Sequence, residues 1–139
     1  MADTLLLQLV SPERMLVDEQ VTEAQIPALD GFIGVLPGHA PLVSELKTGG
    51  VLSYQAEGKE KVLAVYGGFV EVLPDRVRVL ADGAEHREEI DLKAAQEQLA
   101  KATAAAQNTQ QGTQENPDAA IAEMQRAQAR VDAAVKPSN

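Results

Sequence analysis

The chain has 139 residues, a formal net charge of −9 and no cysteine, and aromatic residues make up only 3% of it. Nucleic acid is a poor partner for such an acidic chain, because phosphate binding requires a basic surface, and the lack of cysteine excludes disulfides, a thiol nucleophile and a zinc–thiolate site. No apolar run approaches the ~18 residues that span a bilayer, so we expect membrane contact only through partner proteins.

Residues 1–86 have the pattern of a β-domain. The segments TLLLQLVS and VTEAQIPAL, which begin at Thr4 and Val21, have the length and apolar content of strands. β-Branched and aromatic residues on both sides of Glu57 and Gly58 predict a hairpin that turns at these two residues.

A second hairpin is predicted to turn at Pro74 and Asp75. Beyond the turn, Arg76 and Arg78 alternate with valines, which is typical of a strand with one solvated face. Several short strands separated by turns at regular intervals indicate an antiparallel sandwich or barrel.

Residues 87–139 are expected to form a second, helical domain. Alanine becomes frequent, and apolar residues recur at helical spacing from a start near Asp91. After a polar stretch that contains Gly112, Asn116 is expected to cap a second helix that begins at Pro117. The inward-facing residues of this predicted antiparallel hairpin are Leu92, Ala95, Leu99, Ala102 and Ala106 on the first helix, and Ile121, Met124, Gln128, Val131 and Val135 on the second.

The apolar stripe of the helical hairpin is thin. Burying each of its few large apolar side chains contributes ~1.5–3 kcal/mol, and the total is of the same order as the entropy cost of ordering some forty residues, or smaller. We therefore expect the hairpin to need a surface to dock on, and to be able to exchange one surface for another.

His39 lies in GVLPGHAPLV, a segment rich in turn residues. No nucleophile elbow, phosphate loop or dinucleotide-binding glycine pattern accompanies it. His39 and His86 are far apart and have no helix-spaced partner, so no metal site is expected. From the residues alone, His39 either bonds backbone groups in its loop or is a contact residue on an exposed, rigid loop. Two functions remain open on this pattern: an enzyme that uses His39, and a free-standing adaptor made of the sandwich and the hairpin.

Three segments carry a resemblance to a known family. They are GFIGVLPGHAPLVSELKTGGV at 31–51, YGGFVEVLPDRVRVLADGAEHREEIDLKAAQEQL at 66–99, and the two-helix tail. Together they resemble the epsilon subunit of bacterial and plastid F-type ATP synthases. The resemblance implies a ten-stranded antiparallel β-sandwich over residues 1–86 and a two-helix hairpin over residues 87–139.

The resemblance also implies a non-catalytic rotor subunit. The sandwich would bind the gamma subunit and rest on the c-ring, and so couple the two during proton-driven ATP synthesis. The hairpin would move between a folded state on the sandwich and an extended state among the alpha and beta catalytic subunits, where it inhibits ATP hydrolysis. The complex would hold the chain at the cytoplasmic face of the bacterial plasma membrane, as a peripheral subunit.

Two sets of contact residues follow from the same resemblance. Phe32, Gly34 and His39 would meet the c-ring, with Phe32 and Gly34 in the turn next to the histidine loop. Members of the family often have an acidic or polar residue at the position of Phe32, so here an apolar contact would replace a polar one.

Some bacterial members bind regulatory ATP on the folded hairpin. One arginine of that motif is replaced here by Ala94, and the loss of a guanidinium removes several charge-assisted donors. We therefore expect no cofactor, or at most weakly bound regulatory ATP; the alternative is that the matching residues are solvated helix charges. The residues that match the motif are Glu85, Ile90, Asp91, Arg126 and Arg130.

Overall fold

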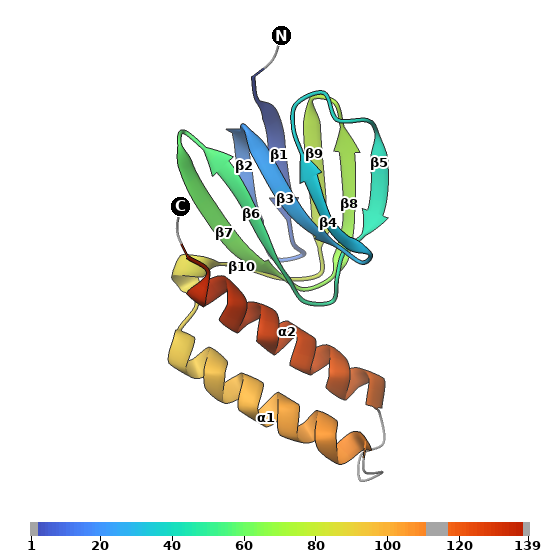
Figure 1. Ribbon diagram of the computed structural model, residues 1–139, viewed down its shortest axis with the longest axis vertical. Helices are drawn as coiled ribbons and strands as arrows, with labels where there is room; N and C mark the ends of the chain where they lie inside the picture. The colour runs from blue at the N-terminus through green and yellow to red at the C-terminus, as the bar shows by residue number, and fades with distance from the viewer. Residues whose placement is uncertain (1–2, 111–116, 138–139) are drawn as a thin grey trace.

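Residues 3–110 and 117–137 are described by the computed structural model of the chain. Within them, ten strands form two five-stranded sheets that pack face to face as a β-sandwich, and two helices lie together below it (Figure 1). The predicted ten-stranded sandwich followed by a helical hairpin is confirmed. The strands are β1 (Leu5–Val10), β2 (Met15–Val21), β3 (Glu23–Ala28), β4 (Gly31–Val35), β5 (Leu42–Glu45), β6 (Gly50–Ala56), β7 (Lys59–Val65), β8 (Gly68–Leu73), β9 (Arg76–Ala81) and β10 (Ala84–His86). The helical elements are the 3₁₀ turn η1 (Arg87–Glu89), α1 (Leu92–Gln110) and α2 (Pro117–Val135).

Sheet A has the strand order β2-β1-β9-β8-β5, and sheet B has the order β10-β7-β6-β3-β4. Among the described strands, every pairing is antiparallel except that of β1 with β9, which is parallel. This departure from the antiparallel expectation arises because the β1–β2 and β8–β9 hairpins lie side by side, with β1 and β9 running in the same direction.

Both predicted hairpin turns are confirmed. Glu57 and Gly58 connect β6 to β7 with positive φ angles of 53° and 77°, which suit a tight two-residue turn. Pro74 and Asp75 connect β8 to β9. Local turn chemistry was therefore enough to locate both hairpins.

The sandwich core fills the space between the two sheets. Alternate residues of each strand enter it, so that β9 buries its valines and turns Arg76 and Arg78 outward, as predicted. Its largest fully buried side chains are Leu5, Leu7, Leu9, Ile26, Leu52, Leu63, Val21, Val35, Val65, Val70 and Val72.

The second helix packs between the first helix and the sandwich (Figure 1). It begins at Pro117, as predicted, whereas Asn116 and Gly112 lie outside the described residues. The single inward stripe predicted for α2 is wrong, because Gln128 and Val135 are exposed. A helix with partners on two sides has two buried faces, and α2 uses alanines for both. The buried helix residues are Ala127, Ala129 and Ala133 on α2, and Ala95, Ala102 and Ala106 on α1, the latter three as predicted.

Candidate functional site: the docked hairpin and the outer face of sheet A

The docked hairpin rests on the outer face of β6 and β7. Ala133 of α2 is fully buried against Val62 and Ala64 of β7, and Tyr66 and Ile90 pack around this cluster. These contacts involve small side chains, so the apolar area that holds the hairpin on the sandwich is limited.

Polar contacts supplement this small apolar cluster. Arg130 of α2 donates from Nε to Glu85 Oε1 at 2.9 Å and from Nη2 to Glu85 Oε2 at 3.3 Å. Its Nη1 also donates to Gln98 Oε1 of α1 at 3.1 Å. One guanidinium therefore joins β10, α1 and α2. The hydroxyl of Tyr66 donates to the same Glu85 carboxylate, and burial together with this hydrogen bond raises the Tyr66 pKa.

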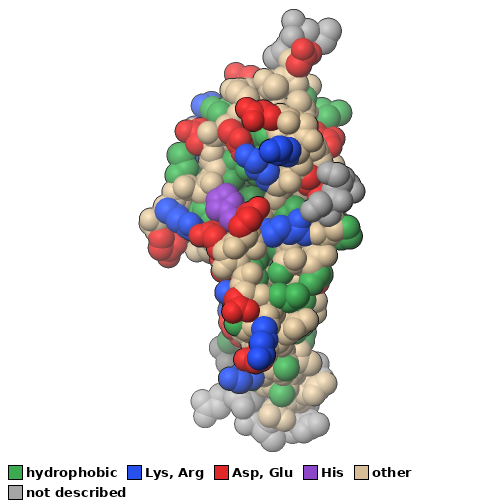
Figure 2. Space-filling view, turned by 90° about the vertical axis from the view of Figure 1, so that its left-hand side faces the viewer, with side chains coloured by type: hydrophobic (Ala, Val, Ile, Leu, Met, Phe, Trp, Pro, Cys, Tyr) green, Lys and Arg blue, Asp and Glu red, His purple; other side chains and the backbone are tan. Residues whose placement is uncertain are grey.

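The end of α2 has two further contacts with the rest of the chain. Lys136 donates from Nζ to both carboxylate oxygens of Glu60 at 3.2 Å, and Arg87 donates from Nε to the Ala133 carbonyl oxygen at 2.9 Å. Acidic and basic side chains lie side by side around the junction between sandwich and helices (Figure 2). The C-terminal half of α2 is therefore held by both charge and packing.

Of the residues expected to bind ATP, Glu85, Arg126 and Arg130 line one small cavity, whereas Ile90 and Asp91 do not. Arg126 donates to Glu123 of its own helix at 3.1 Å, and Arg130 is occupied by Glu85. The cavity between these groups has a volume of about 160 Å³, well below the ~300 Å³ typical of small-molecule sites. Phosphate groups would have to displace a carboxylate from each arginine.

Ile90 and Asp91 have structural contacts. Ile90 packs against the cluster around Ala133, and Asp91 Oδ1 accepts a hydrogen bond from the Ala94 backbone N–H at 3.2 Å. Asp91 therefore caps the start of α1, where an aspartate satisfies a free backbone donor. Ala94 is exposed on α1.

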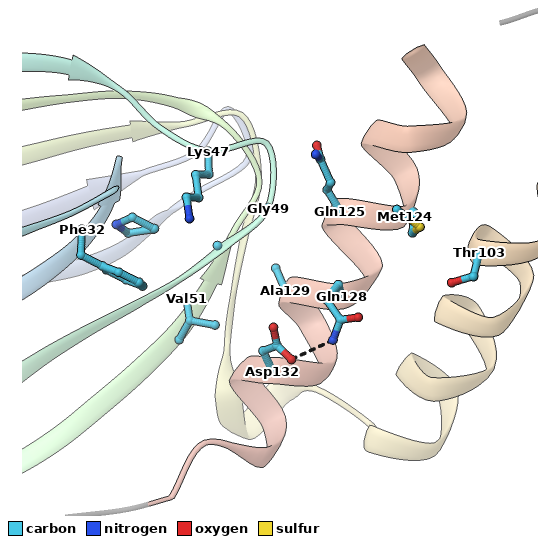
Figure 3. A pocket seen from close by; sticks show the side chains of 12 residues that line it. Phe32, Lys47, Gly49, Val51, Thr103, Met124, Gln125, Gln128, Ala129 and Asp132 are labelled. Atoms are coloured by element: carbon cyan, nitrogen blue, oxygen red, sulfur yellow. Dashed lines mark hydrogen bonds between the residues drawn. The ribbon is translucent and has the colours of Figure 1, made fainter. Parts of the chain in front are cut away.

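Phe32 and Gly34 lie within strand β4, and their expected position in a turn is wrong. The strand forms because Ile33 and Val35 alternate with them and pair with β3. The Phe32 ring is 60% exposed and lies below the Lys47 ammonium, 5.7 Å from Nζ to the ring centroid. Phe32 borders the docked helix (Figure 3). His39 follows the opposite end of β4.

His39 lies in the loop that connects β4 to β5. The loop is tied to the β8–β9 turn by a hydrogen bond from the Gly38 N–H to the Pro74 carbonyl oxygen at 2.7 Å. The His39 ring donates from Nδ1 to the Ala40 carbonyl oxygen, also at 2.7 Å. This bond fixes the orientation of the ring, and together with the Gly38 bond it favours a rigid loop.

A row of apolar side chains crosses the outer face of sheet A. Val10 pairs with Met15 on one side and with Leu80 on the other, and Leu80 pairs with Phe69. The exposed fractions are 51% for Met15, 52% for Leu80 and 55% for Phe69. We call these four residues the apolar row. Both helices pack on the side of sheet B, so they leave the row uncovered.

The apolar row was not predicted from the sequence, although strand alternation contained its signal. If Val70 and Val79 point into the core, then Phe69 and Leu80 must point out. Contiguous exposed apolar side chains of this kind are typical of a protein-binding surface.

A cluster of charged groups lies at the junction between the sandwich and η1. Arg14 forms a two-pronged ion pair with Glu89, at 2.7 and 2.9 Å, and this pair together with the His86 backbone N–H lowers the pKa of Glu89 to about 2. Beside it, Tyr54 donates to Glu19 at 2.6 Å. Burial and this bond raise the Tyr54 pKa, while the bond lowers that of Glu19. The Arg14–Glu89 pair fixes η1 to the sandwich, and the Tyr54–Glu19 bond joins β6 to β2.

Residues 3–110 and 117–137 contain no group of three or more His, Asp or Glu side chains placed to hold a metal ion. Within the same residues, neither helix is long and apolar enough to cross a bilayer. The described site combines an exposed apolar row on one sheet of the β-sandwich with a helical hairpin docked on the other.

Comparison with known proteins identifies the family. Residues 4–87 match the model of the "ATP synthase, Delta/Epsilon chain, beta-sandwich domain". The chain is 49% identical to the ATP synthase epsilon chain of Solibacter usitatus, over 98% of this chain and 99% of that one, and 42% identical to that of Granulibacter bethesdensis, over 92% and 95%. The chain therefore belongs to the family of ATP synthase delta/epsilon chains, which are non-catalytic stalk subunits.

Structural comparison agrees on the fold. A chain in the mitochondrial ATP synthase of Euglena gracilis, in a structure of its OSCP, F1 and c-ring parts, superposes with a TM-score of 0.79 at 24% identity, over 93% of this chain and 80% of that one. A chain from the central stalk and c-ring of the Tetrahymena thermophila enzyme superposes with a TM-score of 0.51 at 13% identity, over 61% and 68%. The first superposition spans nearly the whole chain, so that chain shares its overall fold. The alternative of an enzyme built around His39 is set aside by the family.

Proposed function

We propose that this chain couples the gamma subunit to the c-ring in the rotor of an F-type ATP synthase and regulates ATP hydrolysis through its hairpin. The observation that carries the coupling proposal is the apolar row, which offers an uncovered surface on a chain of this family. We assign the row to the gamma subunit.

The c-ring contact is assigned to the end of the sandwich that carries His39, or to the Phe32 edge of β4. Both present exposed apolar groups: Leu36 beside the histidine loop is 58% exposed, and Phe32 is 60% exposed. Because the His39 loop and the Phe32 edge lie at opposite ends of β4, we expect the c-ring to contact one of these two regions more than the other. The membrane is reached only through the ring, and the chain lies at the cytoplasmic face of the membrane.

The hairpin is proposed to inhibit ATP hydrolysis, and we refer to this role as that of a brake. Its docked state rests on a small alanine-rich contact and a few polar bonds, so modest competing contacts can displace it. In the extended state, α2 would lie among the alpha and beta subunits. ATP would act, if at all, as a weak regulatory ligand of the docked state.

Co-expression with the gamma subunit of an ATP synthase tests the coupling proposal. We expect the two chains to elute together in size-exclusion chromatography, and separate elution would contradict it. A chain shortened to residues 1–89 should still bind gamma, because it retains the apolar row, and should raise ATP hydrolysis in the reconstituted complex. Unchanged hydrolysis would show that the hairpin is no brake.

A further inference from the structure

Two adjacent glycines lie at the start of β6, Gly49 just before the strand and Gly50 as its first residue, and they differ in what they touch. A Cβ added at Gly50 would lie 2.6 Å from the Cβ of Pro27, which belongs to strand β3 of the sandwich. A Cβ added at Gly49 would lie 2.6 Å from the backbone C of Gln125 and 2.9 Å from the backbone N of Arg126, and closer still to the Gln125 carbonyl oxygen. Gly50 is therefore required by the sandwich, whereas Gly49 is required by the docked helix.

The constraint at Gly49 comes from the neighbouring helix and not from its own backbone. Gly49 is not among the glycines with a left-handed φ angle, so an alanine fits the local chain. The atoms it would meet belong to the backbone of α2, which cannot rotate away as a side chain can. Ordinary carbon contacts are ~3.5–4.0 Å, so turn and helix would have to separate.

The surroundings of this contact are open (Figure 3). A cavity of about 530 Å³ lies between the sandwich and α2, bordered by Phe32, Lys47 and Val51 on one side and by Met124 and Gln128 on the other. Gly49 is thus a point where the sandwich touches this half of α2 directly. Further along, Arg130 and Lys136 tie α2 to Glu85 and Glu60, which limits how far the helix can shift to make room.

We infer that Gly49 is a positioning residue for the hairpin: its missing side chain lets the turn before β6 touch the backbone of α2, and a single methyl group there releases the docked hairpin without harming the sandwich. Because the hairpin is the proposed regulatory element, the regulatory consequence of this assignment rests on the proposed function. The steric assignment itself concerns the isolated chain.

Hydrogen exchange of the full chain, read by mass spectrometry, tests the assignment with Gly49→Ala. The matched control is Gly34→Ala, where an added Cβ would meet at 3.2 Å only the end of the Gln25 side chain, which can turn away. In Gly49→Ala, α2 amides should exchange about ten- to a hundredfold faster than in the unaltered chain, with sandwich amides unchanged. Gly34→Ala should match the unaltered chain.

Two results would overturn the assignment. If the α2 amides of Gly49→Ala stay as protected as in the unaltered chain, the contact does not control docking. If sandwich and α2 lose protection together, the methyl group damages the sandwich instead. Titration of Tyr66 gives a second measure, with Gly49→Ala made in a Tyr54→Phe background so that Tyr66 is the tyrosine observed. Release of the hairpin removes the burial of Tyr66 by α2, so the Tyr66 pKa should fall toward its usual value of 10. An unchanged value would also count against release.

Hydrolysis by the reconstituted complex separates this inference from the proposed brake. A released hairpin has more freedom to extend, so Gly49→Ala should lower ATP hydrolysis relative to the unaltered chain. If exchange shows release but hydrolysis is unchanged, the assignment of Gly49 stands and the brake fails. If exchange shows no release, the assignment of Gly49 fails whatever the hydrolysis rate.

Discussion

Arg130 Nε lies 2.9 Å from Glu85 Oε1 and so joins the second helix to the last strand of the sandwich. Both side chains are about three-quarters buried, which reduces the screening of the pair by solvent and salt. Two of the five residues that the family resemblance assigned to a nucleotide therefore bind each other in this structure. The relationship makes the ion pair a determinant of docking, and makes ATP binding a competition with it.

Removing this ion pair should loosen the hairpin. Glu85→Gln, Arg130→Gln and the double variant form a cycle in which we expect a coupling free energy of about 1 kcal/mol between the two residues. The measurement is the exchange protection of α2 amides. Arg126→Gln is the matched control, because Arg126 pairs with Glu123 on its own helix. Equal losses for Arg126→Gln and Arg130→Gln would contradict the role of Glu85.

The two tyrosines should resist ionisation while the chain is folded. Each has a pKa raised above 10 by burial and by a hydrogen bond to a carboxylate. Their contribution to stability is therefore complete below pH 10 and is lost as the pH rises through the folded-state pKa. Tyrosinate absorbance should appear together with alkaline unfolding, and Tyr54→Phe and Tyr66→Phe separate the two groups. A folded-state transition near pH 10 for both would contradict the described hydrogen bonds.

The Arg14–Glu89 pair should make stability fall in mild acid. The folded-state pKa of Glu89 is about 2, against a usual 4.5, so its contribution is present above pH 4.5 and is lost as the pH falls toward 2. Both side chains are partly exposed, so the effect should shrink in high salt. Urea unfolding between pH 5 and 2 measures the free energy of unfolding. In Glu89→Gln this free energy should fall less steeply as the pH decreases. An equally steep decline in Glu89→Gln would assign it to other carboxylates.

ATP should bind weakly or not at all. Ala94 supplies no guanidinium, and Arg126 and Arg130 already have carboxylate partners. Isothermal titration of the full chain should give an affinity weaker than micromolar, and Ala94→Arg should strengthen it, since the new guanidinium adds charge-assisted donors. Glu123→Gln should help by freeing Arg126. Micromolar or tighter binding by the unaltered chain would show that phosphate displaces the carboxylates readily.

Short-range features of this fold could be predicted because their causes are local. The hairpin turns at Glu57–Gly58 and Pro74–Asp75 follow from turn chemistry, and the start of α2 at Pro117 follows from the preference of proline for a first helical position. The sandwich also followed from strand alternation and the family resemblance.

Features that depend on contacts between distant segments could not be predicted. Periodicity gives one apolar face per helix, whereas α2 has two partners and buries alanines that looked unremarkable. Gly49 and Gly50 are both turn glycines in sequence, and only the position of Gln125 distinguishes them. The ion pair of Arg130 with Glu85 likewise joins residues 45 positions apart.

Charge substitutions in the apolar row test most directly whether the row binds gamma. Phe69→Asp and Leu80→Asp place a carboxylate on an exposed apolar position, so the fold should survive while binding falls at least about tenfold. Val135→Asp is the matched control, because Val135 is 52% exposed on α2, away from the row. In co-expression with a gamma subunit followed by size-exclusion chromatography, the account predicts that Phe69→Asp and Leu80→Asp elute without gamma while Val135→Asp elutes with it. Retention of gamma by both row variants would contradict the account.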